Sequence, residues 1–219
     1  MILINLKTYK ESFGEKGIEL ARLAYRVSKQ TGVRIVVASG ALSAGKIMEE
    51  TGAEVWLQHV DQYPEGKYTG WIPISQALEM GIKGSLLNHS EHKIPKGTIS
   101  KILKSKPKGF EIMVCAGSRG QMEKWGHKIK PEWFLYEPPE LIASTTTSVA
   151  LAKPEAIKNA VEAAGGTKLI VGAGVKSKED VVISLKLGAK GVGLSSALVL
   201  GKNPEKLLTE LAGGFKDFE

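Results

Sequence analysis

Glu137 is the residue whose setting most strongly suggests chemistry. It follows the run Trp133-Phe134-Leu135-Tyr136, which predicts a short buried strand, and it precedes two prolines. A residue before proline is held in an extended conformation, so this carboxylate is rigidly mounted at the end of a strand. The residues that follow, 141–148, are rich in Ala, Ser and Thr. A fixed carboxylate before such a loop suggests a base beneath a lid that opens and closes. The structural alternative is a solvated glutamate in a proline-ended turn.

The surrounding elements must bring other reactive groups to Glu137. Short apolar runs predict eight strands, at 2–5, 33–38, 55–58, 84–87, 110–115, 133–136, 168–171 and 191–194. Amphipathic runs predict helices between them, at 17–30, 41–51, 74–80, 96–104, 120–125, 154–164, 178–187 and 204–211. Regular alternation of strand and helix indicates parallel strands with right-handed crossovers, and eight such units close most simply into a barrel. We therefore expect an α/β protein with a single (β/α)8 barrel domain over residues 1–219.

Active sites of such barrels lie at the C-terminal ends of the strands, and the last two strands usually hold phosphate. The residues at those positions are Asn5, Lys7, Gln58, His59, Asn88, His89, Ser90, Cys115, Glu137, Gly172, Ala173, Gly174, Ser195 and Ser196. Acid, histidine and lysine side chains converge there, with two small-residue loops whose backbone N–H groups can hold an anion. A glycosidase would need a second carboxylate beside Glu137, and none of these residues supplies one.

Composition narrows the class of protein. The chain has 219 residues and a net charge of +7, but its lysines are dispersed and it has no aromatic RNA-binding motif, so we expect no nucleic-acid partner. The apolar runs are too short to cross a bilayer, and we expect no membrane association and a cytoplasmic location. The single cysteine, Cys115, and four histidines without ligand spacing predict neither an internal disulfide nor a metal site.

Several motifs together resemble the triosephosphate isomerase family in its short archaeal form. They are Asn5-Leu6-Lys7 for the family's N-x-K, Asn88-His89-Ser90-Glu91 for N-H-S-E, Tyr136-Glu137-Pro138 for Y-E-P, Gly172-Ala173-Gly174-Val175 for G-A-G-I, and Ser195-Ser196 for Ala-Ser. A further run, Tyr68-Thr69-Gly70, is similar to the family's interface loop. The five motifs occur in the family's order and span residues 5 to 196.

The resemblance implies a cofactor-free isomerase that interconverts dihydroxyacetone phosphate and D-glyceraldehyde 3-phosphate through an enediolate, in glycolysis and gluconeogenesis. It implies that Glu137 is the base, that His89 polarises the substrate oxygen, and that Lys7 supplies positive charge. The substrate-binding residues that it implies are Asn5, Leu6, Lys7, Ile142, Gly174, Ser195 and Ser196. The small phosphorylated triose would be the only ligand, without metal.

The resemblance also implies a homo-oligomer, a dimer or a tetramer, in which Thr69 lies at the interface. Aromatic residues near it, Tyr63, Tyr68 and Trp71, are compatible with a buried interface or with a cap on the barrel.

Two motifs depart from the family's pattern. The lid motif Ile-Gly-Thr-Gly is here Ile142-Ala143-Ser144-Thr145, so two glycines are replaced and the rate of lid closure is the property most affected. His92 follows Glu91 where the family has Arg or Lys, which affects surface pairing. The alternatives are another phosphate-binding barrel isomerase or lyase, a basic nucleic-acid-binding module, and a catalytically inactive structural barrel.

Overall fold

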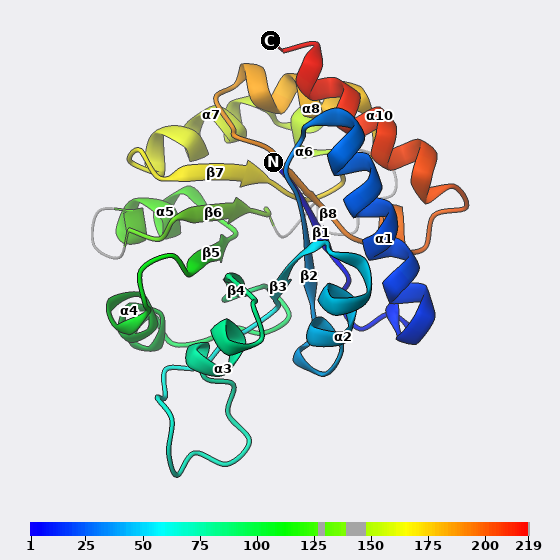
Figure 1. The fold of residues 1–219 in the computed structure, drawn as a ribbon. Helices are drawn as coiled ribbons and strands as arrows, with labels where there is room; N and C mark the ends of the chain where they lie inside the picture. Colours follow the sequence, from blue (N-terminus) through cyan, green and yellow to red (C-terminus); the bar gives the residue numbers. More distant parts are fainter. Residues whose placement is uncertain (127–129, 139–147, 219) are drawn as a thin grey trace.

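Eight parallel strands close into a barrel in sequence order, as seen in a computed structural model (Figure 1). The structure describes residues 1–126, 130–138 and 148–218. The strands are β1 (Ile2–Asn5), β2 (Ile35–Ser39), β3 (Glu54–Leu57), β4 (Gly84–Leu87), β5 (Glu111–Ala116), β6 (Trp133–Tyr136), β7 (Lys168–Val171) and β8 (Val192–Leu194). Strand β1 pairs with β8, with Ile2 opposite Val192, and this pairing closes the sheet. The predicted (β/α)8 barrel is confirmed.

Helices cover the outside of the barrel between successive strands (Figure 1). The longer ones are α1 (Gly14–Thr31), α2 (Ala41–Thr51), α3 (Ile74–Glu79), α4 (Lys96–Ser105), α5 (Arg119–Gly126), α7 (Pro154–Ala163), α8 (Lys178–Lys186) and α10 (Pro204–Lys216). Three shorter segments are the 3-10 turn η1 (Lys10–Ser12) and the helices α6 (Val149–Ala152) and α9 (Ser196–Val199). The sequence did not predict these three, because one helical turn is too short to show a periodic pattern.

Two helices end at the glycines that the sequence predicted as their ends, whereas a third helix continues past its predicted end. Gly32 and Gly52 adopt left-handed conformations, with φ of 76° and 66°, and end α1 and α2 as predicted. Helix α10 was predicted to end at residue 211 but continues to Lys216. Gly213 and Gly214 have low helix propensity, but Gly214 lies directly against Val181 of α8. A close contact between the two helices therefore stabilises the last turns.

The apolar core has two layers because successive strand residues point to opposite faces of the sheet. Inside the barrel lie alternate strand residues, which form one buried cluster: Met1, Leu3, Val36, Ala38, Trp56, Leu86, Met113, Cys115, Trp133, Leu135 and Ile170. The other strand faces pack against the helices in a larger cluster, to which Ile2, Ile4 and Leu6 belong. The two layers make the strands a rigid frame for their C-terminal ends.

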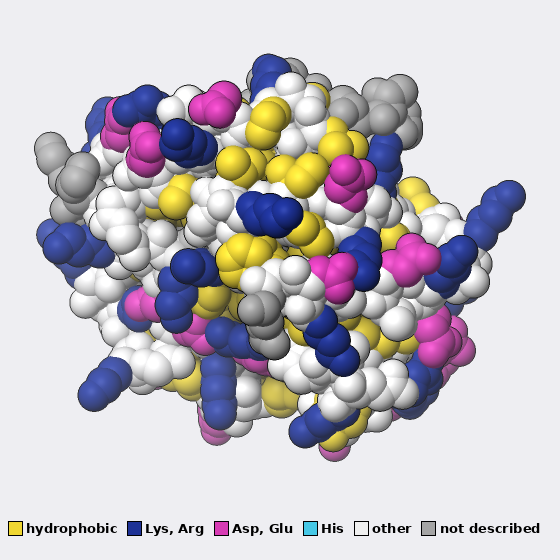
Figure 2. Space-filling model, turned by 90° about the horizontal axis from the view of Figure 1, so that it is seen from above, with side chains coloured by type: hydrophobic (Ala, Val, Ile, Leu, Met, Phe, Trp, Pro, Cys, Tyr) yellow, Lys and Arg dark blue, Asp and Glu magenta, His cyan; other side chains and the backbone are white. Residues whose placement is uncertain are grey.

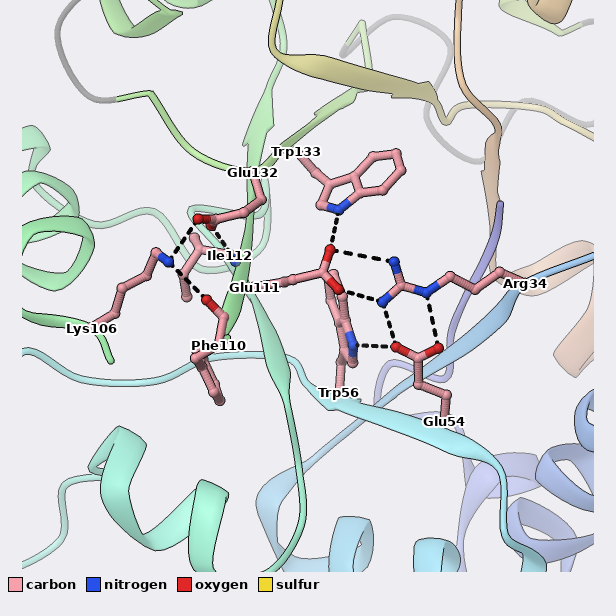
Figure 3. A network of polar contacts seen from close by, with 9 residues as sticks. All are labelled: Arg34, Glu54, Trp56, Lys106, Phe110, Glu111, Ile112, Glu132 and Trp133. Carbon is pink, nitrogen blue, oxygen red and sulfur yellow. Dashed lines mark hydrogen bonds and ion pairs between the residues drawn. The ribbon is translucent and has the colours of Figure 1, made fainter. Parts of the chain in front are cut away.

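A charged network closes the N-terminal end of the barrel (Figure 3). The Arg34 guanidinium lies 2.6 Å from the Glu54 carboxylate and 2.5 Å from the Glu111 carboxylate. The indole N–H groups of Trp56 and Trp133 donate to the same two carboxylates, at 3.1 and 2.6 Å. Four strands, β2, β3, β5 and β6, are thus connected near their first residues, at the end of the barrel opposite the C-terminal strand ends.

The segment between β3 and α3 stands away from the barrel as a long loop (Figure 1). Asp61 and Ile72 fasten its base, because the Asp61 N–H donates to the Ile72 carbonyl at 2.9 Å and the Ile72 N–H donates to the Asp61 carboxylate at 2.8 Å. Within the loop the Tyr63 ring stacks on Tyr68 and tilts against Trp71, with both centroid distances 4.7 Å. Tyr68 and Trp71 remain 42% and 50% exposed, so these aromatics do not cap the barrel.

Charges are mixed on the face shown in Figure 2, where lysine and arginine side chains are scattered among acidic ones. That distribution agrees with the dispersed lysines of the sequence and lacks the continuous basic stripe of a nucleic-acid-binding surface on this face. None of the helices in the described ranges is long and apolar enough to cross a membrane.

Candidate active site

A cleft opens at the C-terminal ends of the strands and collects most of the predicted site residues. We call it the substrate cleft; its lining includes Leu3, Asn5, Lys7, Leu135, Glu137, Gly174, Ser195 and Ser196. These residues come from the ends of β1, β6, β7 and β8. His89 follows β4 and reaches the same place through its contact with Glu137. Residues distant in sequence thus meet because parallel strands end at one face of the barrel.

Glu137 and His89 present two buried polar atoms to each other. Glu137 Oε2 lies 3.3 Å from His89 Nε2, and neither atom has a hydrogen-bond partner among the described residues. Buried polar atoms are normally satisfied, so an unpaired pair at a cleft is typical of a site that awaits a ligand. Gly172 makes room for the carboxylate, because a Cβ at that position would lie 2.6 Å from Glu137 Cγ.

The backbone at Glu91 fixes the tautomer of His89. The Glu91 N–H donates to His89 Nδ1 at 3.3 Å, so Nδ1 acts as an acceptor and carries no proton. We therefore assign the proton of the neutral ring to Nε2, the atom that faces Glu137. The ring can donate a hydrogen bond at the point where a substrate oxygen would lie.

Asn88 shapes the turn that presents His89. Its φ of 60° is left-handed, a conformation that asparagine adopts more readily than most residues. The side-chain amide donates to the Cys115 carbonyl at 3.0 Å, and its oxygen accepts from the Ile94 N–H at 3.3 Å. Both bonds connect the turn to neighbouring segments, so His89 leaves β4 in a defined direction.

Lys7 also occupies a left-handed turn, with φ of 49°. Asn5 Oδ1 accepts from the Lys7 N–H at 3.0 Å, and Gln58 Nε2 donates to the Lys7 carbonyl at 3.1 Å and to Asn5 Oδ1 at 3.2 Å. At the other end of the side chain, Lys7 Nζ binds Glu91 Oε1 at 2.6 Å. Hydrogen bonds thus fix the Lys7 backbone, and the ion pair with Glu91 fixes its ammonium at the rim of the cleft.

Gln58 and Glu91 are site residues to which sequence reasoning assigned no role. Gln58 stood among the strand-end residues, and Glu91 ended the N-H-S-E motif. Their contacts with Asn5 and Lys7 connect segments 51 to 84 residues apart. Position at a strand end was the signal available in the sequence; the contact partners emerge only in three dimensions.

The loop after β7 forms the opposite wall of the substrate cleft. Ala173 and Gly174 both have positive φ, 67° and 78°, a geometry that turns successive N–H groups toward one side. Ser195 Oγ is buried and has no partner in the described part of the chain. Ser196, expected in a loop, begins α9 instead. These donors could together hold an anion.

Two predicted residues, Leu6 and Thr69, lie away from the substrate cleft. The Leu6 side chain is 1% exposed and packs in the outer core, while its N–H donates to the Ala38 carbonyl at 3.0 Å. Thr69 is exposed on the long loop and does not line the substrate cleft. Ile142 lies outside the described residues, as do Ala143, Ser144 and Thr145 of the predicted lid. Their predicted roles stay predictions.

Cys115 lies buried behind Glu137. Burial raises the pKa of its thiol well above the ordinary value, and the negative charge of Glu137 raises this pKa further. A thiol that stays protonated is a poor nucleophile, so the environment favours the packing role over reactivity.

His59 and His92 form a pair beside the site. His59 Nε2 lies 3.0 Å from Asp61 Oδ1, and the two imidazole centroids are 4.3 Å apart. Burial lowers the pKa of His59, and the opposing attraction to Asp61 does not overcome it. Among the residues that the structure describes, no group of three or more His, Cys, Asp or Glu side chains could hold a metal ion.

The comparisons with known proteins agree with this geometry. A family model described as "Triosephosphate isomerase" matches residues 1–211. A triosephosphate isomerase of Metallosphaera sedula is 38% identical over 218 residues, covering 98% of this chain and 95% of that protein. One of Saccharolobus solfataricus is 37% identical and covers 96% of this chain and 93% of that protein; one of Methanothermus fervidus is 37% identical and covers 96% of each. The chain belongs to the triosephosphate isomerase family.

Proposed function

We propose that this protein interconverts dihydroxyacetone phosphate and D-glyceraldehyde 3-phosphate. The observation that carries the proposal is the buried, unpaired couple of Glu137 Oε2 and His89 Nε2, 3.3 Å apart, facing a cleft whose far wall offers donors for an anion. Membership of the triosephosphate isomerase family supports the same reaction. A phosphorylated three-carbon substrate would place its reacting carbons at the couple and its phosphate at the far wall.

Glu137 is the base in this scheme. Its carboxylate takes the proton from carbon 1 of dihydroxyacetone phosphate, and the electrons of the broken C–H bond form the double bond of an enediolate. Glu137 then returns the proton to carbon 2, while the proton of the carbon-1 hydroxyl passes to the oxygen on carbon 2. No electrons leave the substrate, so the reaction needs no redox cofactor.

His89 and Lys7 stabilise the charge that develops on oxygen. A neutral His89 with its proton on Nε2 donates to the substrate oxygen, an arrangement for which triosephosphate isomerases are the standard example. Lys7 Nζ, held by Glu91, supplies a fixed positive charge between the reacting oxygen and the phosphate. A charge that is already in place does not have to be reoriented when the negative charge develops on the substrate oxygen.

The phosphate would bind between the two loops that follow β7 and β8. Support comes from the left-handed pair Ala173 and Gly174 and from the unpaired Ser195 hydroxyl, together with the N–H of Ser196 at the start of α9. Asn5 adds a polar contact at the floor of the cleft, and Leu6 would contribute only backbone. Closure of Ile142 over the phosphate belongs to the same proposal and rests on the family resemblance.

A coupled assay with D-glyceraldehyde 3-phosphate tests both the reaction and the base. Wild-type protein should be active, and Glu137→Gln should lose at least about 10² to 10⁴ in kcat, because a positioned general base contributes that much. Glu210→Gln, which removes an exposed carboxylate of α10, is the matched control and should keep full activity. Equal activity in the wild type and Glu137→Gln would contradict the assignment of the base, and an inactive wild type would favour the inactive structural barrel.

The same proposal includes self-association as a dimer or a tetramer through the loop that carries Thr69. Support comes from the exposed Tyr68 and Trp71 on a segment that stands away from the barrel (Figure 1). Exposed aromatic clusters of this kind are common at protein interfaces. We also propose a cytoplasmic location, with which the single buried thiol of Cys115 is compatible.

A further inference from the structure

Asp180, on α8, has more hydrogen bonds than a helix cap requires. The side chain is completely buried. Its Oδ2 accepts from the Ser177 N–H at 3.0 Å, from Ser177 Oγ at 2.9 Å and from the Lys176 N–H at 3.0 Å. Its Oδ1 accepts from the hydroxyl of Ser148, which lies 32 residues earlier in the chain. One buried carboxylate thus collects four donors from two separate segments.

Only part of this arrangement serves the helix. Ser177 and Asp180 form a capping box at the start of α8, a local device that satisfies N–H groups of the first turn. The bonds to Lys176 and to Ser148 go beyond it, because they connect the loop after β7 with the start of α6. A backbone bond of 3.3 Å from the Val149 N–H to the Ala173 carbonyl joins the same two segments.

The loop that Asp180 anchors is under backbone strain. Ala173 has φ of 67°, and a left-handed conformation is unfavourable for a residue with a Cβ. Strained conformations at functional sites persist only where the surroundings hold them. The contacts that can do so include the bonds that the Asp180 carboxylate accepts from Lys176 and Ser148, and the bond from the Val149 N–H.

We propose that Asp180 is a positioning residue for the phosphate side of the substrate cleft. Its carboxylate fixes the loop after β7 against α6, and the loop in turn aims the N–H groups at Gly174 into the cleft. Asp180 does not line the cleft itself, so it acts through the loop. The inference rests on the proposed function because it takes the anion to be the phosphate of a triose phosphate. It predicts that the loss of Asp180 weakens recognition of the phosphate and spares the proton transfer.

A comparison of two substrates distinguishes a loss of phosphate recognition from a loss of proton transfer. D-Glyceraldehyde has the reacting carbons of glyceraldehyde 3-phosphate but lacks the phosphate. Asp180→Asn should lower kcat/KM for the phosphorylated substrate by about 10-fold or more, up to the roughly 10² that a misplacement of 1 Å can cause. The slow turnover of D-glyceraldehyde should not change. Ser148→Ala removes one donor and should show the same split to a smaller degree.

Ser184→Ala is the matched control. Ser184 lies one turn further along α8, is buried, and donates to the Asp180 carbonyl at 2.7 Å without contact to the loop. Its loss should destabilise the helix and leave both kcat/KM values unchanged at a temperature where the protein is folded. If Asp180→Asn does not fold, the kcat/KM values of Ser148→Ala on the two substrates decide the test. Equal losses on the two substrates, the same split in Ser184→Ala, or no loss in either test variant would overturn the proposal.

Calorimetric binding of phosphoglycolate keeps this inference distinct from the proposed function, because binding needs no turnover. Weaker binding by Asp180→Asn than by wild type supports the role of Asp180 even if the wild type proves inactive as an isomerase. Equal binding by the two proteins overturns that role, whatever the wild-type activity.

Discussion

At the scale of single residues, the site depends on side chains whose atoms point in fixed directions. His89 has its Nδ1 occupied by the Glu91 N–H, and Lys7 has its ammonium held by the Glu91 carboxylate. Glu91 therefore contacts both His89 and Lys7: its backbone N–H donates to His89, and its carboxylate binds Lys7 and also lies 3.6 Å from His89 Nδ1. Because 57% of its side chain is exposed, the ion pair is open to screening by salt.

Glu91→Gln tests what the carboxylate of this residue contributes beyond its backbone N–H. The substitution keeps the backbone N–H on His89 Nδ1 but removes the charge that holds Lys7 Nζ. We expect kcat/KM for glyceraldehyde 3-phosphate to fall by roughly 10-fold, equivalent to about 1.4 kcal/mol of transition-state stabilisation. Glu123→Gln, which removes the exposed partner of Arg119, is the control and should be unaffected. Unchanged kinetics in Glu91→Gln would mean that the turn at Lys7 alone places the ammonium.

At the scale of elements, the helices are held by specific contacts with one another as well as by their apolar faces. Helix α10 packs beside both α8 and α1 (Figure 1). Its two adjacent glycines differ in what surrounds them. A Cβ at Gly213 would meet nothing within 4 Å, whereas a Cβ at Gly214 would lie 2.9 Å from Val181 Cβ and 3.0 Å from the Lys178 carbonyl oxygen.

Alanine at these two neighbouring positions should have opposite effects. Gly213→Ala should raise the free energy of unfolding by about 0.5 to 1 kcal/mol, because alanine favours the helix and finds open space. Gly214→Ala should lower it by about 1 to 3 kcal/mol, because α8 must move. Urea unfolding at one pH measures both. The same sign for the two variants would show that α10 does not pack against α8 as described.

At the scale of the whole molecule, the two ends of the barrel serve different purposes. The C-terminal end keeps polar atoms unpaired for a ligand, while the N-terminal end pairs its charges across four strands (Figure 3). In barrels of this kind, features of the N-terminal end contribute to stability and those of the C-terminal end to catalysis. Glu111 belongs to the stabilising end.

Stability should depend on the ionisation of Glu111. Burial alone would raise the pKa of Glu111, but hydrogen bonds from Arg34 and Trp133 and the charges of Arg34 and Lys168 outweigh burial and lower it. A pKa that is lower in the folded state contributes stability above the ordinary value of 4.5, and that contribution is lost as pH falls through the folded-state pKa. Glu111→Gln should therefore be less stable than wild type at pH 7, and the difference should shrink below about pH 4.5.

Urea unfolding of both proteins from about pH 7 to 3 measures this difference. Glu210→Gln controls for the simple loss of a negative charge, since Glu210 lies on the exposed side of α10. A difference between wild type and Glu111→Gln that stays constant over the whole range would contradict a contribution from ionised Glu111.

Self-association is a second property of the whole molecule. Thr69→Arg places a charge on the exposed loop, and we expect the assembly to dissociate toward the 23.6 kDa chain in sedimentation velocity. Phe218→Ser, which removes an aromatic side chain that is 49% exposed at a distant position, should leave the assembly intact. A wild type that sediments as a monomer would contradict the proposed oligomer.

The sequence alone determined the barrel and the identity of its main chemical groups. Alternation of short apolar and amphipathic runs predicted eight strands, because hydrophobic periodicity is a local property that each segment carries by itself. Strand-end position placed Glu137, His89 and Lys7 among the candidates, since the C-terminal ends of parallel strands must meet, and the family resemblance then singled out these three. Element boundaries were less accurate, as with α10, because its end depends on a neighbouring helix and not on its own residues.

Only the tertiary structure decided which atoms touch. Hydrogen bonds between segments have no local signature in a sequence. The sequence therefore did not indicate that Gln58 holds the turn at Lys7 or that Asp180 binds Ser148. It also offered no sign that Leu6 points away from the cleft, since alternation along β1 assigns faces only once the barrel has an inside. The residue types in the site come from local patterns; their orientation comes from distant segments that the closed barrel brings together.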